Sequence, residues 1–331
     1  MKTLLNKLIT VSIIIVFTIV AFVIGFSCKK KTEPVPEPEP TPTPIVDNYS
    51  SLQDFYNQNG VPLQTFTLNA VTGGTFVSNK STTINIPANA FVDLSSNPVT
   101  GTVAIQFKDI YTKSDMLFSN VHSDSYFGPL KSAGEFFIKA VAASNPVNIA
   151  GGKKLTIEQP VQPLAVADFS MAPFGANDTV GTNFTTINPW YTDASYTLLV
   201  NTTQYIFDMY AFNNPVANGS WCNSDNPSYF NIYPQTSLTA AETGTFTGVI
   251  DVFIIFKNVT SMVHVYKTGP NYTYYYAPVG LPCYLVAVGV NSNKLYSSIS
   301  NSFAITNTQT VNFSLTETTS NDFKNAVTAL Q

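Results

Sequence analysis

The sequence predicts an all-β protein: two antiparallel β-sandwich-like domains with short N- and C-terminal helices. Two observations predict this class. Short runs alternate apolar with polar or small residues, as where Val103, Ile105 and Phe107 recur at every second position, which is typical of half-buried strands. Turn residues separate these runs, and nothing between them is long and helical enough to connect parallel strands. The pattern therefore favours antiparallel sandwiches over a βαβ fold.

The first domain is expected over residues 49–162. A helix is predicted at its start, because Ser50 and Ser51 can cap it and Gly60 can end it. Strands are predicted after this helix, in the short alternating runs at 83–86, 102–108, 136–140 and 155–157.

Residues 163–228 are predicted to be a loop-rich connection. This segment is irregular, is interrupted by several prolines, and holds both tryptophans, Trp190 and Trp221. Large aromatic side chains in such a segment favour packing in a core or between domains.

The second β-sandwich domain is expected over 229–331. The run 249–256 is largely apolar, which predicts a strand covered on both faces. Residues 268–271, Thr-Gly-Pro-Asn, predict a hairpin turn between two strands. At the C-terminus, Phe323, Val327 and Leu330 have helical spacing, so the domain is expected to end in a helix.

The N-terminus has the pattern of a bacterial lipoprotein signal peptide over residues 1–27. Lys2 and Lys7 precede an apolar run at 8–26, which is followed by Ser27 and Cys28. Cys28 is predicted to become the lipidated first residue, carrying a diacylglycerol and an added acyl chain such as palmitate. The alternative is an uncleaved transmembrane anchor, because this apolar run is long enough to span a bilayer. Both alternatives place the body outside the cytoplasm.

Residues 28–48 are predicted to be an extended linker. Proline occupies every second position from Pro34 to Pro44, and this spacing favours a polyproline conformation. Such a linker would act as a stalk between the lipid anchor and the folded body.

Composition argues against nucleic-acid partners. All 16 basic residues are lysine, the net charge is −4, and only 11% of residues are charged. Without arginine the chain lacks the bidentate group suited to phosphate and guanine, and without net positive charge it does not attract polyanions.

Two cysteines remain if Cys28 is lipidated, and they leave two alternatives open. In an oxidising compartment Cys222 and Cys283 could form a disulfide. They could equally be two buried free thiols, because spacing in the sequence does not show whether they approach each other.

Part of the chain resembles a known domain family. The strings Gly73-Gly74-Thr75-Phe76, 83–91 (TINIPANAF) and 99–103 (VTGTV) resemble the opening of the β-sandwich domain shared by zonula occludens proteins, netrin receptors and ankyrins. Together with 108–117 and 132–136, the string is similar to uncharacterised lipoproteins of Bacteroidota. The resemblance covers most of residues 60–330 and implies a β-sandwich fold and an interaction role in the cell envelope.

The residues give little indication of catalysis, so the prediction is that the chain is not an enzyme. Its two histidines, His122 and His264, are expected in a polar turn and on the outer face of a strand. Neither has a partner at zinc spacing, so no metal or other cofactor is predicted. Glu135 follows a glycine at the start of a strand and could be buried, but this gives it little indication of a function. An exported hydrolase remains an alternative, and it requires one imidazole to meet a carboxylate and a nucleophile.

Two further features are candidate sites. Tyr272, Tyr274 and Tyr276 have period-two spacing and would share one face of a strand. That face could bind a sugar or a protein, or it could be ordinary cross-strand packing. Thr179 lies in an Asp-Thr-Val string that resembles an O-glycosylation acceptor of exported Bacteroidota proteins.

We therefore expect a lipid-anchored envelope protein, at the outer membrane or cell surface, with a non-enzymatic binding or assembly role. Its partners would be the membrane through the anchor and an envelope protein or glycan, but not nucleic acid. One alternative is a glycan-binding surface lipoprotein of a polysaccharide-uptake system, and another is the exported hydrolase.

Overall fold

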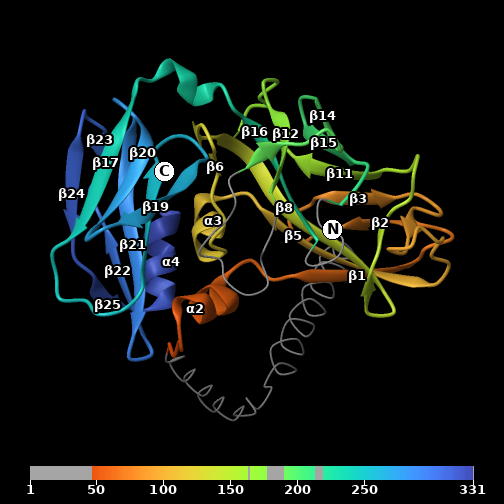
Figure 1. The fold of residues 1–331 in the computed structure, drawn as a ribbon, viewed down its shortest axis with the longest axis horizontal. Coiled ribbons are helices and arrows are strands. Elements are labelled where there is room, and N and C mark those ends of the chain that lie inside the picture. Colours follow the sequence, from red (N-terminus) through yellow and green to blue (C-terminus); the bar gives the residue numbers. More distant parts are fainter. Residues whose placement is uncertain (1–46, 163–164, 177–189, 213–218, 331) are drawn as a thin grey trace, which may run out of the picture. The chain divides into compact units, whose positions relative to one another are not determined.

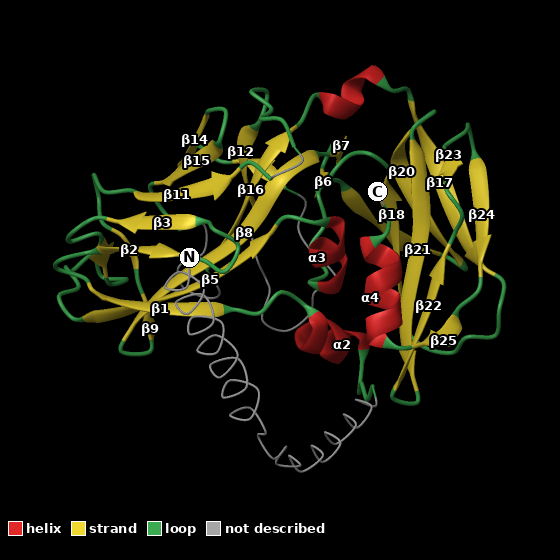
Figure 2. Ribbon diagram, turned by 180° about the vertical axis from the view of Figure 1, so that it is seen from behind, coloured by secondary structure: helices red, strands yellow, loops and turns green. Residues whose placement is uncertain are grey.

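The computed structural model describes residues 47–162, 165–176, 190–212 and 219–330. These residues are mostly strands in antiparallel sheets, arranged as sandwiches (Figures 1 and 2), which confirms the predicted fold class. Residues Asp47–Gln331 group as one compact unit. The predicted signal peptide, Cys28, most of the linker and Thr179 lie outside the described residues.

The first sandwich pairs a five-stranded sheet with a seven-stranded sheet. The segment 163–228, for which a loop-rich connection is expected, contributes strands β12 to β16 to these two sheets. The five-stranded sheet has the order β14 (Tyr196–Val200), β15 (Gln204–Met209), β11 (Leu155–Pro160), β3 (Thr83–Ile86), β2 (Gly74–Val77). The seven-stranded sheet has the order β1 (Gln64–Asn69), β5 (Thr102–Ile110), β8 (Lys131–Ala142), β16 (Ser220–Asn226), β12 (Ala172–Ala176), β13 (Tyr191–Thr192), with β9 (Asn145–Pro146) beside β8.

Alternation along the strands builds the core of this sandwich. In β5 every second side chain is buried, beginning at Val103, and Phe107 stacks on Phe136 of β8 with ring centroids 5.8 Å apart. Phe207 of β15 meets Phe136 edge-on from the five-stranded sheet. The predicted period of two therefore corresponds to a real interface between two sheets. A short pair, β4 (Phe91–Val92) with β10 (Asn148–Ile149), lies outside both sheets.

The second sandwich is formed by one nine-stranded sheet. Leu238, Phe256, Cys283 and Phe313, from four of its strands, share one hydrophobic cluster. Its order is β24 (Gln309–Phe313), β17 (Gln235–Glu242), β20 (Asn271–Pro278), β19 (Met262–Thr268), β18 (Ile250–Phe256), β21 (Pro282–Asn291), β22 (Lys294–Ile299), β25 (Thr316–Thr318), with β23 (Phe303–Ala304) beside β21. All these pairs are antiparallel except β17 with β24.

Two predictions for this sheet are confirmed. Strand β18 is buried on both faces from Asp251 onward, as its apolar run indicates. Strands β19 and β20 form a hairpin in which Thr268 pairs with Asn271, and Gly269 between them adopts a φ of +65°, which glycine accepts without strain.

Three short helices lie between the seven-stranded and nine-stranded sheets (Figures 1 and 2). They are α2 (Leu52–Asn59), α3 (Lys113–Phe118) and α4 (Ser320–Thr328). Ser51 and Thr319 cap α2 and α4 by accepting a hydrogen bond from a backbone N–H, so the predicted terminal helices are confirmed. Helix α3 was not predicted, although Thr112 and Asp115 form a capping box at its start.

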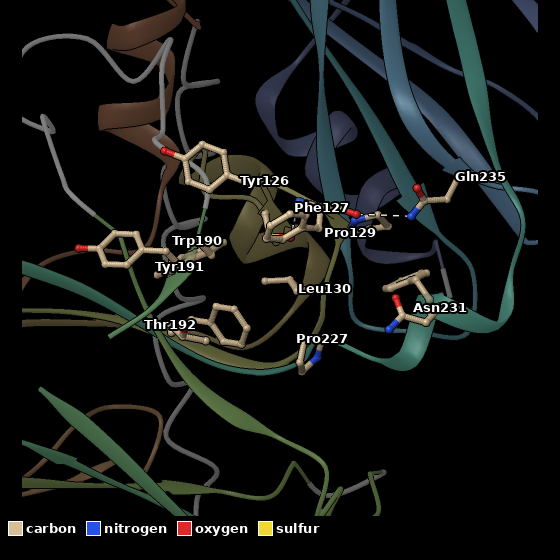
Figure 3. A pocket seen from close by; sticks show the side chains of 13 residues that line it. Tyr126, Phe127, Pro129, Leu130, Trp190, Tyr191, Thr192, Pro227, Asn231 and Gln235 are labelled. Atoms are coloured by element: carbon tan, nitrogen blue, oxygen red, sulfur yellow. Dashed lines mark hydrogen bonds between the residues drawn. The ribbon is translucent and has the colours of Figure 1, made fainter. Parts of the chain in front are cut away.

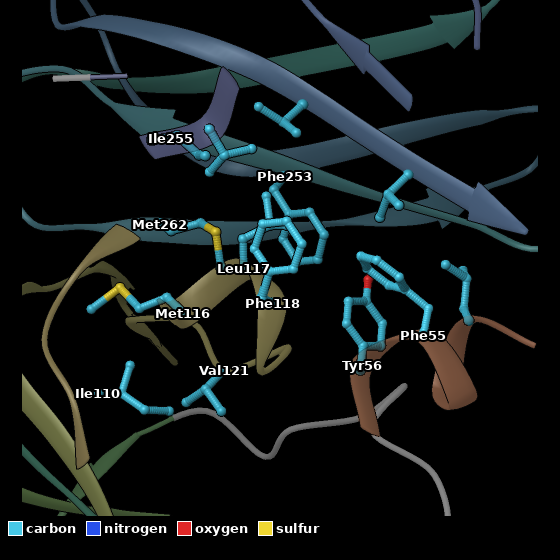
Figure 4. Close-up of a cluster of buried hydrophobic side chains, with 14 of the residues drawn as sticks. Phe55, Tyr56, Ile110, Met116, Leu117, Phe118, Val121, Phe253, Ile255 and Met262 are labelled. Carbon is cyan, nitrogen blue, oxygen red and sulfur yellow. The ribbon is translucent and has the colours of Figure 1, made fainter. Parts of the chain in front are cut away.

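One phenylalanine from each helix joins a shared cluster with the nine-stranded sheet. The ring of Phe118 lies 5.5 Å from that of Phe55 and 5.4 Å from that of Phe323, centroid to centroid. Phe55 and Phe118 belong to the same hydrophobic cluster as Phe253 of β18, and all three are labelled in Figure 4. Burial of these rings explains why such short helices are stable, since helices of this length are marginal alone.

Among the described residues, no helix is long and apolar enough to cross a membrane.

Candidate functional site

The candidate site is a pocket beside a two-stranded hairpin, β6 (Asp124–Ser125) and β7 (Gly128–Pro129). Its volume is about 380 Å³, and segments far apart in the sequence line it (Figure 3). Besides the hairpin, they are β12, the stretch 190–192, the short 3₁₀ helix η1 (Tyr229–Ile232) and the start of β17. The lining residues are Ser125, Tyr126, Phe127, Pro129, Leu130, Phe174, Trp190, Tyr191, Thr192, Pro227, Phe230, Asn231 and Gln235.

The hairpin turn is held in place by several contacts. The Ser125 hydroxyl donates to the Gly128 carbonyl at 2.8 Å and accepts from the Phe127 N–H at 3.2 Å. The Gln235 side chain donates to the Phe127 carbonyl at 3.4 Å. Gly128 has a φ of +121°, and a Cβ there would lie 3.2 Å from that of Tyr276. The turn is therefore fixed against β20, while Tyr126 and Phe127 remain 60% and 86% exposed.

The floor of the pocket is rigid and aromatic. Trp190 is only 1% exposed, and its indole N–H donates to the His122 carbonyl at 2.6 Å. Its backbone N–H donates to the Asp124 carbonyl at 2.9 Å. Phe174 and Phe230 are also buried. A pocket with such a floor exists before any ligand arrives, which is usual for ligand sites.

The pocket lining is uncharged. Among its described residues are aromatic rings, hydroxyl groups and two amides, Asn231 and Gln235, but no Asp, Glu, Lys or His. The lining can therefore stack against a ligand and form hydrogen bonds with it, but it offers no side chain that exchanges a proton readily at neutral pH.

The structure corrects the expected tyrosine face on β20. Tyr272 and Tyr274 are 5% and 3% exposed and belong to the core of the second sandwich, so cross-strand packing holds for both. Tyr276 is 40% exposed, beside the exposed Tyr275. The cause is a register irregularity against β17 that lies at these two residues, because a bulge turns two consecutive side chains outward. Of the three predicted residues, only Tyr276 is exposed, and it lies beside the pocket at Gly128.

Both histidines are more covered than expected. His122 is buried rather than in an exposed turn, and burial lowers the pKa of its imidazole to about 3. His264 is not on a free outer face: its Nε2 lies 3.3 Å from Asp251 Oδ1, and its ring centroid is 6.0 Å from that of His122. The expectation of exposure was wrong because helices and the hairpin cover this face of β19.

His264 therefore meets a carboxylate, as the hydrolase alternative requires. Tyr56 of α2 donates to the other oxygen of Asp251 at 2.8 Å, and neither histidine is among the residues that line the pocket. The His264–Asp251–Tyr56 group joins a helix to the second sheet. The sequence reasoning missed Asp251, although a lone carboxylate inside an apolar strand was a usable signal.

A second buried polar group lies in the seven-stranded sheet. Glu135, whose burial the sequence left open, is fully buried, and burial raises the pKa of its carboxyl to about 8. The Asn223 amide donates to Glu135 Oε1 at 3.3 Å and to Asp225 Oδ2 at 2.7 Å. Burial, together with nearby Glu135, raises the pKa of Asp225 well above its ordinary value. Sequence reasoning missed this pairing of Glu135 with Asp225, because strand register brings them together.

Cys222 and Cys283 are free, buried thiols in the structure. Cys222 lies in the core of the first sandwich and Cys283 in that of the second. Burial raises the pKa of the Cys283 thiol to about 12. Of the two alternatives left open by the sequence, the structure contains the pair of free thiols.

Fold and pocket together define a β-sandwich protein with a preformed, uncharged aromatic pocket. No protein-family model matches the chain, and no curated protein matches it significantly.

Proposed function

We propose that this chain is a lipid-anchored cell-envelope protein that acts by binding, without catalysis, and that the aromatic pocket is its binding site. The observation that carries the proposal is Phe127, which is 86% exposed on a turn fixed by hydrogen bonds. Covering a phenylalanine side chain contributes about 1.5–3 kcal/mol. Because the turn is already ordered, little of that gain is lost in fixing it on binding.

The pocket supports binding better than catalysis. Its described lining holds rings, hydroxyls and amides but no ordinary acid or base, while the carboxylates and imidazoles described above are buried elsewhere. Aromatic residues are enriched among binding hot spots, and here Trp190, Phe174 and Phe230 are buried in the lining while Tyr126 and Phe127 remain exposed at its edge.

The lipid anchor and the cell-envelope location in this proposal are supported by the sequence. Lys2, Lys7, the apolar run and Cys28 support lipidation and export, and the proline-rich linker supports display of the pocket away from the lipid surface. Mass spectrometry of the native N-terminus tests this part. We expect Cys28 to carry a diacylglycerol and an added acyl chain, with residues 1–27 removed, and an intact Met1 would contradict the lipid anchor.

Site-specific photocrosslinking tests the pocket without assuming the ligand. Phe127 is replaced by the photoreactive p-benzoylphenylalanine, and intact envelopes of the native host are irradiated. We expect covalent adducts of higher mass. The matched control carries the same group at Tyr210, an exposed tyrosine of the first sandwich, and should form none. Absence of adducts at 127, or the same adducts at both positions, would overturn the proposed binding site.

A further inference from the structure

We infer that the ligand of the aromatic pocket is a neutral carbohydrate chain, an inference that rests on the proposed binding function. The argument comes from the chemistry of the lining, from its charge and from its free hydrogen-bonding groups.

The lining combines flat rings with hydrogen-bonding groups at their edges. Phe127 and Tyr126 stand at the rim, while Trp190 forms part of the floor (Figure 3). A sugar ring has the matching chemistry, because its C–H faces pack on aromatic rings and its hydroxyl edges form hydrogen bonds. A purely aliphatic ligand would use the rings but leave the polar rim without partners.

The absence of charge favours a neutral ligand. Among the described lining residues none carries a charge. Lys131, one residue beyond the lining residue Leu130, is already paired with Asp168 at 2.7 Å. The Asp124 carboxylate accepts from Tyr274 at 2.7 Å. A uronic acid, a sulfate or an acidic peptide would therefore lose water without gaining a counter-charge, which is costly.

The two amides at the rim suit hydroxyl groups in particular. The Asn231 side chain makes no hydrogen bond within the described part of the chain, and Gln235 uses one N–H on the Phe127 carbonyl. Each amide can donate and accept hydrogen bonds. A sugar hydroxyl can do both as well, so the two groups are complementary. Asn231 lies on η1 and Gln235 at the start of β17, so both are held by regular structure.

The pocket has a size suited to a short part of a sugar chain. Its volume of about 380 Å³ falls within the range of roughly 300–1,000 Å³ that is usual for small-molecule sites. The exposed ring of Phe127 extends the stacking surface beyond the pocket, which would suit a chain longer than the pocket.

Isothermal titration calorimetry on the full mature chain in detergent tests the inference. The probes are the neutral hexasaccharides of glucose (α-1,4 and β-1,4), xylose, mannose and N-acetylglucosamine, with hexagalacturonate as the charged comparator. We expect saturable binding of at least one neutral probe and none of hexagalacturonate. Phe127→Ala should weaken that binding by about tenfold or more, the effect of losing about 1.4 kcal/mol. Asn231→Ala should also weaken it, and the control Tyr210→Ala should change it by less than about twofold.

The outcomes separate this inference from the proposed function. The inference is overturned if no neutral probe binds, if hexagalacturonate binds more tightly, or if Phe127→Ala leaves binding unchanged. If the benzoylphenylalanine at 127 then still forms adducts with an envelope polypeptide, binding at the pocket stands and the ligand is a protein. If it forms none, both proposals fail. Circular dichroism and thermal unfolding of each variant check its fold, which a change at the exposed Phe127 should preserve.

Discussion

We expect the free energy of unfolding of the native protein to fall as the pH rises from about 5 to about 8. Replacing Glu135 by Gln should make this fall much smaller. Glu135 is fully buried, and its Oε2 has no hydrogen-bond partner. Burial raises the pKa of this carboxyl from 4.5 to about 8. The native state therefore holds a proton that the unfolded chain releases over this range of pH.

The sign and size of the effect follow from that proton. Because the folded-state pKa is the higher one, protonated Glu135 contributes stability that is fully present below about pH 4.5 and is lost as the pH rises to about 8. One linked proton gives a slope of about 1.4 kcal/mol per pH unit, so the loss between pH 5 and 8 is on the order of 3 kcal/mol. Glutamine carries no such proton and keeps an oxygen that can accept from Asn223.

Urea unfolding of the native protein and of Glu135→Gln at several pH values between 5 and 8 measures this slope. We expect a smaller slope in Glu135→Gln, with the remainder supplied by Asp225, whose pKa is also raised by burial. The control Glu135→Asp keeps a buried carboxyl and should keep the steep slope while losing stability at every pH. Equal slopes for the native protein and Glu135→Gln would refute the reasoning.

Three further predictions concern backbone, hydrogen bonding and thiols. Gly134→Ala should destabilise the fold by about 3 kcal/mol in urea unfolding, because Gly134 has a φ of +143° and a Cβ would lie 2.4 Å from the ring of Tyr111. Tyr274→Phe should cost about 1–3 kcal/mol, because the phenolic O–H donates at 2.7 Å to a buried carboxylate. Cys222 and Cys283 should resist Ellman's reagent in the native protein at pH 8 and should both react after unfolding, since both thiols are buried.

Matched variants and readouts make each of these predictions decisive. Gly101→Ala introduces a Cβ into open space and should change stability by less than about 0.5 kcal/mol. Tyr275→Phe changes an exposed tyrosine on the same strand as Tyr274 and should be neutral. If Gly134→Ala were equally neutral, the close contact with Tyr111 would not contribute to stability. If Tyr274→Phe were neutral, the same would hold for the buried hydrogen bond. If neither cysteine reacted with Ellman's reagent in the unfolded, unreduced protein, the two would instead form a disulfide.

Local patterns in the sequence were sufficient to predict several strands and both terminal helices, but not strands β12 to β16 in the segment 163–228. The buried strand β18, the β19–β20 hairpin and helix α4 follow from apolar spacing, turn residues and caps, which act over a few residues. Helix α3 was missed because its six residues are too few for a helical period to be visible. Only its capping box, Thr112 with Asp115, marked it in the sequence.

Local patterns did not predict which side chains reach the surface. The period of two grouped Tyr272, Tyr274 and Tyr276 on one face, but the bulge opposite β17 sends Tyr276 outward and leaves the other two in the core. His264 alternates outward from its strand as expected, yet other elements of the chain cover it. Exposure depends on what packs over a strand, and this is a property of the whole chain.

The sequence by itself determined the all-β class, because backbone pairing and side-chain alternation are decided by neighbours along the chain. The pocket was decided only by the tertiary structure. Its walls come from the β6–β7 hairpin, β12, residues 190–192 and η1, which lie far apart in the sequence. These segments come together because two sandwiches and three helices bury their apolar faces against one another. No short stretch of the sequence predicts this packing.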